Sequence, residues 1–402
     1  TAEAVLSLER VLGPEQRAQR QAALEAALEA SGRAELDALA AGLAGRYVAA
    51  GPGNDPIRTP DSLPTGRNLY GFDPSRLPTP ATYAAGARLA EDLVANWRKR
   101  HGRAPSRLVF NLWGVESSRH EGVMEAQIMA LWGVKPVWDP RGRVSGVSAI
   151  PRAELKRPRI DVTVVPSGLY RDLFAPLMKL LDEASTAARN SPEEDNPLRR
   201  HAAETKAALL AQGVAEEEAE RLAAVRLFSV PSGAYGTNLS KVIPLSNTWR
   251  DEKEVADVYF LRMSHAYGQG YWGGRVIRDG KVSAEVAPRI AVDLLKLALK
   301  GAEGAIHSRS SNIYATLDND DFYQYLGGTA MAIRQVNGAT PEVLVTNMSN
   351  PKALHTETLE KYMGREMRAR YLNPNWIGAM LREGYAGARF MHQVVEIGRA
   401  HV

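Results

Sequence analysis

One pattern of apolar and polar positions recurs five times along the chain: a short β-branched or apolar run, a polar loop and a helical segment. The runs lie at 107–113, 160–167, 225–231, 304–310 and 342–349, and the helical patterns follow over 119–132, 170–183, 238–243, 321–336 and 357–370. Strands that alternate with helices form mainly parallel sheets covered by helices on both faces. The pattern therefore predicts an α/β fold with its polar loops at the carboxyl ends of the strands, where such sheets bind ligands.

The remaining segments predict a multi-domain arrangement. Residues 14–50 are rich in Ala, Leu and Glu at helical spacing, and Gly32 is expected to separate two helices. Residues 51–68 hold too many Pro and Gly for regular structure, so this segment is interpreted as a linker or a binding loop. The charged segment 185–221 is expected to form surface helices between two α/β regions. We therefore predict a helical segment at 1–50, α/β regions at 51–222 and 223–395, and a non-native tail at 396–402, where the amphipathic pattern breaks.

Composition narrows the classes of function. The 402 residues include 50 Lys and Arg against 46 Asp and Glu, a net charge of +4 without blocks of like charge, which disfavours nucleic-acid binding. The absence of Cys excludes disulfides, thiolate catalysis and thiolate-ligated metals, and it is consistent with a cytoplasmic protein. No apolar run approaches the ~20 residues of a membrane helix. The start of the chain shows no signal-peptide pattern, and because the first residue is not Met we expect a piece of a longer protein.

The glycine-containing loop at 226–239, RLFSVPSGAYGTNL, has two interpretations. A phosphate-binding loop requires G-x-x-x-x-G-K-[ST], but Gly233 and Gly236 are only three positions apart and Thr237 stands where Lys is required. The chain is therefore not expected to hydrolyse nucleoside triphosphates. The loop is either a strand–helix turn with Thr237 as N-cap, or a place where a flat ligand approaches the backbone beside the ring of Tyr235.

The segment WGVESSRHEG, 113–122, places several polar groups at one helix start. Ser118 and Glu121 have the spacing of a capping box, which would explain Glu121 structurally. Glu116, Arg119 and His120 have no such explanation, and a His beside carboxylates can serve as a base or a metal ligand. A single His is weak evidence for a metal site, because permanent sites cluster their ligands.

Two further loops carry candidate chemistry. Arg171 stands at a helix start, where a cation is unfavourable, so it needs a carboxylate from Asp172 or from a ligand. In HSRSSNIYATLDNDD, 307–321, the acids Asp318 and Asp321 are spaced as a helix cap and a first-turn acid. Alternatively, His307 with Asp318 or Asp320 could hold a divalent metal transiently.

Six blocks together resemble the large subunits of multisubunit tetrapyrrole metal chelatases, of the cobaltochelatase (CobN) and magnesium chelatase H type. The blocks occur in the family's order at 45–80, 113–122, 154–174, 226–239, 317–328 and 371–390. Within the family, HSRSSNIYATLDNDD and WGVESSRHEG are more similar to the cobalt type. A family block of the form H-x-T-H-G-x-x-E-W, which lies upstream in such proteins, is absent from this chain, so only part of an active site is expected here.

The resemblance implies a ligase that forms nitrogen–metal bonds within a larger complex. The substrates would be Co²⁺ and hydrogenobyrinic acid a,c-diamide in cobalamin biosynthesis. Mg²⁺ with protoporphyrin is the nearest alternative, and a non-catalytic tetrapyrrole-binding protein is another. ATP would be hydrolysed by separate AAA+ motor subunits rather than by this chain.

The resemblance also groups the candidate residues by role. Glu116, His120, His307 and Asp318 are candidate catalytic groups, and His120, His307, Asp318 and Asp320 are candidate transient metal ligands. Corrinoid precursors carry many carboxylates, for which Arg67, Arg119, Arg171 and Arg309 are suitable partners. The macrocycle face would lie against Gly233, Tyr235 and Gly236.

Overall fold

The computed structural model describes residues 14–53, 56, 59–71, 73–278, 281–312, 314–318 and 320–399. The chain forms two compact units that divide between Asp73 and Pro74. Of the tail expected at 396–402, the last three residues lie outside the described part of the chain, and the preceding ones continue helix α17 through Arg399.

The first unit is built on one long helix, α2 (Pro14–Leu43), followed by β1 (Gly51–Pro52), the 3-10 turn η1 (Pro60–Ser62) and β2 (Asn68–Tyr70). The expected break at Gly32 is wrong, because a glycine inside a helix costs only about 1 kcal/mol. The Pro/Gly segment has more regular structure than expected. The Asn68 amide donates to the carbonyl oxygens of Pro52 and Ser62, and β1 pairs with β2 in parallel.

The second unit contains a ten-stranded sheet in the order β11-β10-β9-β8-β7-β6-β3-β12-β13-β14 and a separate hairpin, β4-β5. The strands are β3 (Arg107–Leu112), β4 (Val134–Trp138), β5 (Val144–Ala149), β6 (Asp161–Pro166), β7 (Leu227–Ser229), β8 (His265–Gly268), β9 (Tyr271–Trp272), β10 (Arg275–Arg278), β11 (Lys281–Glu285), β12 (Gly304–Arg309), β13 (Glu342–Asn347) and β14 (His355–Thr358).

The five predicted strands form the parallel centre of this sheet, in the order β7-β6-β3-β12-β13. The chain runs from β3 outward to β6 and β7, and later returns to the other side of β3 as β12 and β13. The strand order therefore reverses between β3 and β12, which makes this the topological switch point of the sheet. The flanking strands, β8 to β11 on one side and β14 on the other, are antiparallel and were not predicted.

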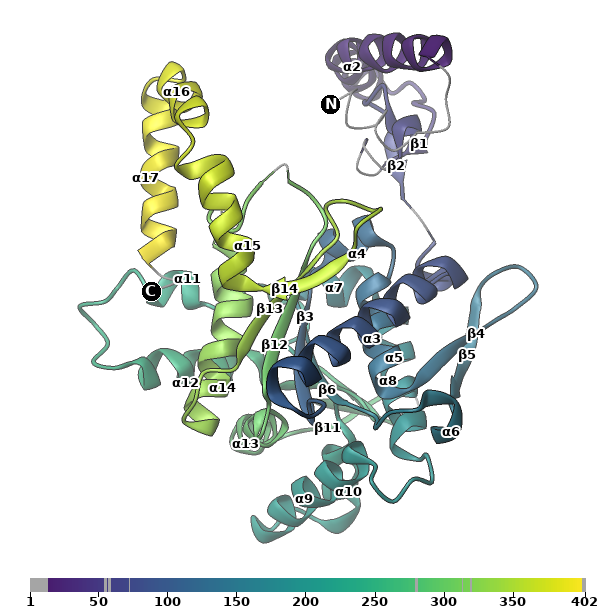
Figure 1. Ribbon diagram of the computed structural model, residues 1–402, viewed down its shortest axis with the longest axis vertical. Coiled ribbons are helices and arrows are strands. Elements are labelled where there is room, and N and C mark those ends of the chain that lie inside the picture. Colours follow the sequence, from purple (N-terminus) through teal and green to yellow (C-terminus); the bar gives the residue numbers. More distant parts are fainter. Residues whose placement is uncertain are drawn as a thin grey trace. The chain divides into compact units, whose positions relative to one another are not determined.

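Helices cover both faces of the sheet, with α3, α5 and α8 on one face and α12, α13 and α14 on the other (Figure 1). The helical segments of this unit are η2 (Pro74–Arg76), α3 (Pro80–His101), α4 (Gly114–His120), α5 (Val123–Trp132), α6 (Arg152–Leu155), α7 (Gly168–Leu173), α8 (Ala175–Arg189), α9 (Pro197–Ala211), α10 (Glu216–Ala224), α11 (Leu239–Val242), α12 (Glu252–Met263), α13 (Pro288–Leu299), η3 (Tyr323–Gly327), α14 (Gly328–Asn337), α15 (Leu359–Glu366), η4 (Met367–Tyr371), α16 (Pro374–Arg382) and α17 (Tyr385–Arg399).

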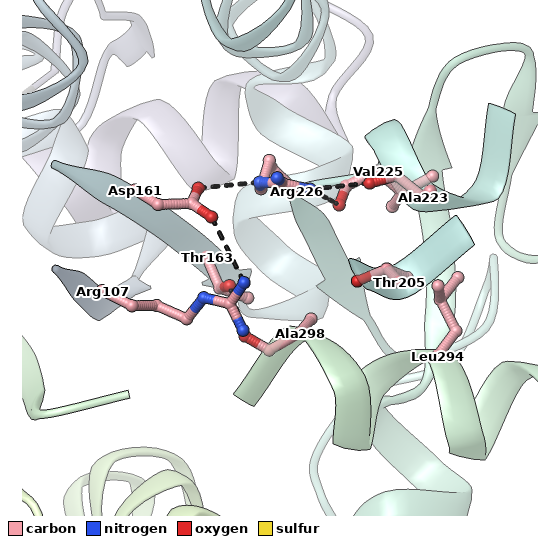
Figure 2. A pocket seen from close by; sticks show the side chains of 9 residues that line it. All are labelled: Arg107, Asp161, Thr163, Thr205, Ala223, Val225, Arg226, Leu294 and Ala298. Atoms are coloured by element: carbon pink, nitrogen blue, oxygen red, sulfur yellow. Dashed lines mark hydrogen bonds and ion pairs between the residues drawn. The ribbon is translucent and has the colours of Figure 1, made fainter. Parts of the chain in front are cut away.

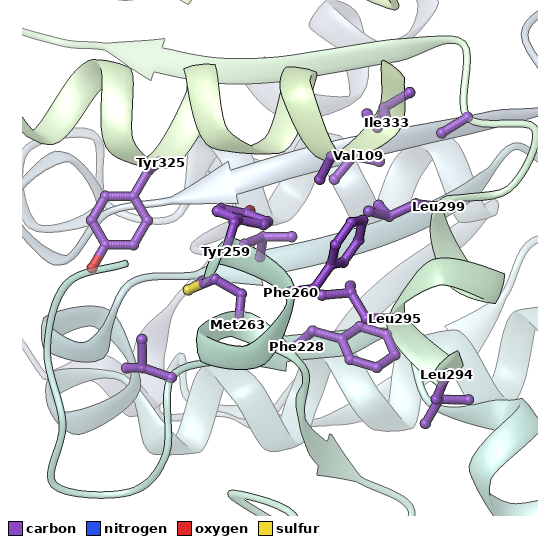
Figure 3. Packing of buried hydrophobic residues seen from close by; sticks show 14 of the residues in the cluster. Val109, Phe228, Tyr259, Phe260, Met263, Leu294, Leu295, Leu299, Tyr325 and Ile333 are labelled. Atoms are coloured by element: carbon purple, nitrogen blue, oxygen red, sulfur yellow. The ribbon is translucent and has the colours of Figure 1, made fainter. Parts of the chain in front are cut away.

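One continuous core joins the strands of both expected α/β regions. Val109 of β3 and Phe228 of β7 pack with Tyr259, Phe260 and further side chains of α12, α13 and α14 (Figure 3). The boundary expected at 222/223 falls between β6 and β7, which are neighbours in the same sheet. The two regions therefore share one sheet and one apolar core.

A buried charge network fastens the amino ends of the central strands, opposite the expected site. Asp161 at the start of β6 accepts hydrogen bonds from Arg226 Nε over 2.8 Å and from Arg107 Nη2 over 3.5 Å, and it contacts His201 Nδ1 of α9 at 2.8 Å. Figure 2 shows this carboxylate between the two arginines beside a small cavity. Burial opposes its ionisation, but Arg226, His201 and Arg107 together hold the pKa of Asp161 well below its usual range.

Candidate functional site

A compact polar cluster lies at the switch point, where β3 and β12 end. Helix α4 begins directly after β3 and carries Arg119, whose Nη1 donates to the Tyr314 hydroxyl over 2.9 Å and lies 3.5 Å from Glu116 Oε1. Arg309, the last residue of β12, places its guanidinium carbon 4.5 Å from the centre of the Tyr314 ring, while that of Arg119 lies 5.3 Å from it. Parallel strands thus bring together residues nearly two hundred positions apart in the chain, since Arg119 and Tyr314 are separated by 195 positions.

Charge within this cluster is strongly coupled. Glu116 is fully buried, and burial raises its pKa above the ordinary carboxylate value although the positive charge of Arg309 opposes the shift. Burial also acts against the charge of Arg309, but Glu116 and Tyr362 more than compensate and raise the Arg309 pKa. Glu116 is therefore a carboxylate with increased proton affinity beside a cation that remains charged. A carboxylate in this environment is suited to accept a proton.

His120 lies in a second buried cluster beneath α4. Its Nδ1 is 4.0 Å from Glu125 Oε2, and the Ser117 hydroxyl donates to Glu125 Oε1 over 2.8 Å. Burial raises the pKa of Glu125. The expected capping box is wrong, because α4 ends at His120 and the chain turns through Glu121 and a glycine, both with positive φ, before α5.

His307 packs as an aromatic side chain in the core. Its ring centroid lies 4.2 Å from that of Trp113 and 5.2 Å from that of Phe322, and the side chain is fully buried. Desolvation and the charge of Arg309 lower its pKa to about 3, so the imidazole is neutral at physiological pH. Nδ1 faces the Asn111 carbonyl at 3.3 Å, and Nε2 has no hydrogen-bond partner within the described residues. The ring of His307 thus packs against aromatic side chains, and its expected role as a base or metal ligand stays a prediction.

Arg171 fastens the glycine-containing loop to α7. Its Nε and Nη2 donate to the two carboxylate oxygens of Asp172 over 2.8 and 2.9 Å, and its Nη1 donates to the carbonyl oxygens of Val230, Pro231 and Ala234. The carboxylate that Arg171 requires at a helix start is therefore supplied by Asp172. Because its guanidinium is fully buried and every nitrogen donates within the chain, this arginine has a structural role.

The other end of the loop is held by side chains from two distant helices. Gln324 Oε1 accepts hydrogen bonds from the backbone N–H and the hydroxyl of Thr237, and Arg262 Nε donates to the Gly236 carbonyl. The Thr237 hydroxyl accepts from the N–H of Leu239, the first residue of α11, but the N-cap position of this helix is Asn238, so the N-cap predicted at Thr237 is one residue too early. Gly233 and Gly236 both have positive φ, a backbone conformation that favours glycine, and this explains why both positions are glycine.

Asp318 and Asp320 lie in the loop before η3, and Asp318 contacts η4. Asp318 accepts hydrogen bonds from the Tyr371 hydroxyl and the Ala315 N–H and pairs with Arg370 at 2.8 Å. Asp320 is half-buried, and its carbonyl accepts the N–H of Gln324. These contacts give Asp318 a structural role in fastening η4, and the metal-binding roles of both acids stay predictions.

No group of three or more His, Asp or Glu side chains with the arrangement of a metal site occurs in the described part of the chain. Arg67 is an exposed residue of the first unit, whereas the other candidate residues belong to the second unit. Sequence reasoning missed Glu125 and Gln324, because each lies inside an apolar helical pattern. Both residues could have been found as a carboxylate or an amide on a helix face that the apolar pattern predicts to be buried.

The chain is similar to known proteins over nearly its whole length. It matches the CobN/Magnesium Chelatase family over residues 3–398. It is 36% identical to the aerobic cobaltochelatase subunit CobN of Sinorhizobium sp, over 91% of this chain and 28% of that protein. It is 34% identical to the H subunit of the magnesium chelatase of Cereibacter sphaeroides, over 94% of this chain and 29% of that protein.

A solved structure shows the same fold. The catalytic subunit of cobaltochelatase from Mycobacterium tuberculosis is similar over the whole of this chain and 32% of its own length, with a TM-score of 0.83 and 32% identity. The chain belongs to the CobN/magnesium chelatase large-subunit family, and it spans less than a third of the length of these relatives. Within the described residues, no helix is long and apolar enough to cross a membrane.

Proposed function

We propose that this chain is a tetrapyrrole-binding portion of the large subunit of an ATP-dependent metal chelatase. Family membership supports the class of reaction, and the polar cluster at the switch point is the observation that supports a site on this chain. A sheet of this topology binds ligands at that place, and Glu116, Arg119 and Arg309 converge there.

The cluster suggests separate roles for its members. The side chain of Arg119 is 15% exposed and can reach a peripheral carboxylate of the macrocycle. The positive charge of Arg309 favours the ionised form of Glu116, so we assign Arg309 the role of stabilising the Glu116 carboxylate. Metal insertion releases the inner pyrrole protons, and Glu116, whose pKa burial raises, is our candidate for their acceptor on this chain.

The most suitable substrates are Co²⁺ and hydrogenobyrinic acid a,c-diamide. The similarity of two loops to the cobalt type supports this choice, and the partly exposed Arg119 suits a carboxylate-rich substrate. Mg²⁺ insertion into protoporphyrin is the second candidate, favoured by the magnesium-chelatase relatives of nearly equal identity. Absorption titrations of the chain with each macrocycle separate the two, because the physiological substrate will bind more tightly.

ATP hydrolysis is assigned to AAA+ partner subunits, since the sequence holds no phosphate-binding loop. We expect the chain alone, incubated with ATP, Co²⁺ and the corrinoid precursor, to release no phosphate and to form no metallated product.

The decisive test is metal insertion by the full-length large subunit with its motor subunits. Glu116→Gln should lower kcat by about a hundredfold, because a positioned general base contributes roughly that much. Arg119→Ala should chiefly raise KM. Normal turnover in both variants would exclude the polar cluster from the reaction.

A further inference from the structure

Exposed apolar side chains gather on the loops after β3, β6 and β7. Val115 of α4, Leu169 and Leu173 of α7, and Tyr235 of the glycine-containing loop are 42%, 41%, 50% and 59% exposed. We propose that these four residues, the apolar platform, bind one face of the tetrapyrrole. This inference rests on the proposed function and identifies the surface that would hold the flat part of the substrate.

Close backbone contacts make the platform continuous. A Cβ added to Gly114 would lie 3.0 Å from Leu169 Cγ, so the leucine side chain lies directly against the start of α4, next to Val115. A Cβ added to Gly168 would lie 2.9 Å from the ring of Tyr235 and 2.6 Å from the Ala234 carbonyl oxygen. Because glycine has no side chain, these two positions allow the loops after β3, β6 and β7 to contact one another.

The ring of Tyr235 is fixed in place although it is exposed. Its hydroxyl donates to Asp172 Oδ2 over 2.6 Å, and the guanidinium carbon of Arg171 lies 5.7 Å from the ring centre. The neighbouring Gly236 is held by Arg262, as described above. An aromatic side chain held this way offers a rigid surface for a flat ligand, because little conformational entropy is lost when the ligand binds.

Charge at the edge of the platform identifies the occupant. Arg119 follows Val115 by four positions on α4, so both project from the same side of that helix. The surface thus combines an apolar centre with a cation at its border. A tetrapyrrole has the complementary pattern, a flat apolar ring system with carboxylates around its periphery. The location at the carboxyl ends of the strands beside the switch point is also where such sheets bind small molecules.

The test uses the purified chain and metal-free deuteroporphyrin IX, with binding followed by the shift of the porphyrin absorption band. Leu169→Asp should raise Kd by about tenfold, because it places a charge against an apolar ring. Leu210→Asp is the matched control, since Leu210 of α9 is also 41% exposed and lies outside the platform. Leu169→Ala, a milder change, should raise Kd by about threefold. Circular dichroism and size-exclusion chromatography report folding and oligomeric state for each protein.

The possible outcomes separate the platform from the proposed function. Weaker binding by both Leu169 variants, with Leu210→Asp unchanged, supports the platform. If the unaltered chain binds porphyrin and all variants bind it equally, the platform is overturned while the proposed function stands. If the unaltered chain binds neither deuteroporphyrin IX nor hydrogenobyrinic acid a,c-diamide in the same titration, the proposed function fails on this chain. A change of oligomeric state in Leu169→Asp with unchanged Kd would instead identify a protein contact and overturn the platform.

Discussion

The guanidinium of Arg119 donates a hydrogen bond of 2.9 Å to the hydroxyl of Tyr314, and this contact joins the loop after β3 to the loop after β12. The Tyr314 ring also lies against the guanidinium of Arg309, 4.5 Å from its carbon. Tyr314 therefore positions both arginines of the cluster.

Replacing this hydroxyl should change substrate affinity selectively. Tyr314→Phe keeps the ring contacts but removes the acceptor for Arg119, and we expect about fivefold weaker binding of a carboxylated tetrapyrrole, the usual worth of one hydrogen bond. Binding of the corresponding methyl ester should not change, which absorption titrations of both ligands will show. Tyr385→Phe, at an exposed position of α17, is the control. Equal weakening for acid and ester would contradict a role through Arg119.

Arg171 should matter for stability rather than for substrate contact. Arg171→Ala leaves three carbonyl oxygens of the loop, one buried and two partly buried, without their donor, so we expect the free energy of unfolding to fall by about 3 kcal/mol. Urea unfolding measures this loss, and Arg98→Ala on the exposed face of α3 is the control. A variant of normal stability with reduced tetrapyrrole affinity would return Arg171 to the role that the sequence predicted.

The Asp161 network should make stability depend on acid pH. The pKa of Asp161 is lower in the folded than in the unfolded protein, so its contribution is complete above about pH 4 and is lost as the pH falls further. Asp161→Asn should lower the free energy of unfolding by about 3 to 5 kcal/mol at pH 7, because it leaves two buried arginines without their carboxylate. The variant should also lose less stability than the unaltered chain as the pH falls below about 4. Urea unfolding between about pH 7 and pH 3 tests both effects. Asp92→Asn, at an exposed position, should behave like the unaltered chain. If Asp161→Asn still loses stability steeply at acid pH, another carboxylate is responsible for the pH dependence.

The burial of neutral His307 should lower the free energy of unfolding as the pH falls below about 6.5. Its folded pKa of about 3 lies far below the ordinary value of about 6.5, so protonation favours the unfolded chain at every pH below about 6.5. The cost approaches about 1.4 kcal/mol per pH unit. His307→Leu should remove this slope between about pH 6.5 and pH 4.5, measured by urea unfolding. His392→Leu, at an exposed position, should retain it, and an unchanged slope in His307→Leu would show that another group is responsible.

The sequence predicted the parallel centre of the sheet because each of its five strands is a short apolar run followed by a helical pattern. It did not predict the antiparallel flanks, whose strands are short or rich in Gly and charged residues. Glu116, Arg119 and Arg309 were selected from the sequence and do meet, because the carboxyl ends of parallel strands share one edge. The sequence left open whether Arg171 pairs with Asp172 or with a ligand, and it did not show that Asp318 pairs with Arg370, since both pairings depend on side-chain geometry.

The order of strands has a consequence for synthesis on the ribosome. Arg119 and Tyr314 are 195 positions apart, and β12 cannot pair with β3 until most of the second unit has been made. During that interval β3 and β6 expose an unpaired strand edge and an apolar face that α13 and α14 later cover. The nascent chain is therefore most vulnerable to aggregation before β12 emerges, and ribosome-bound chains that end ahead of this strand should depend most strongly on chaperones.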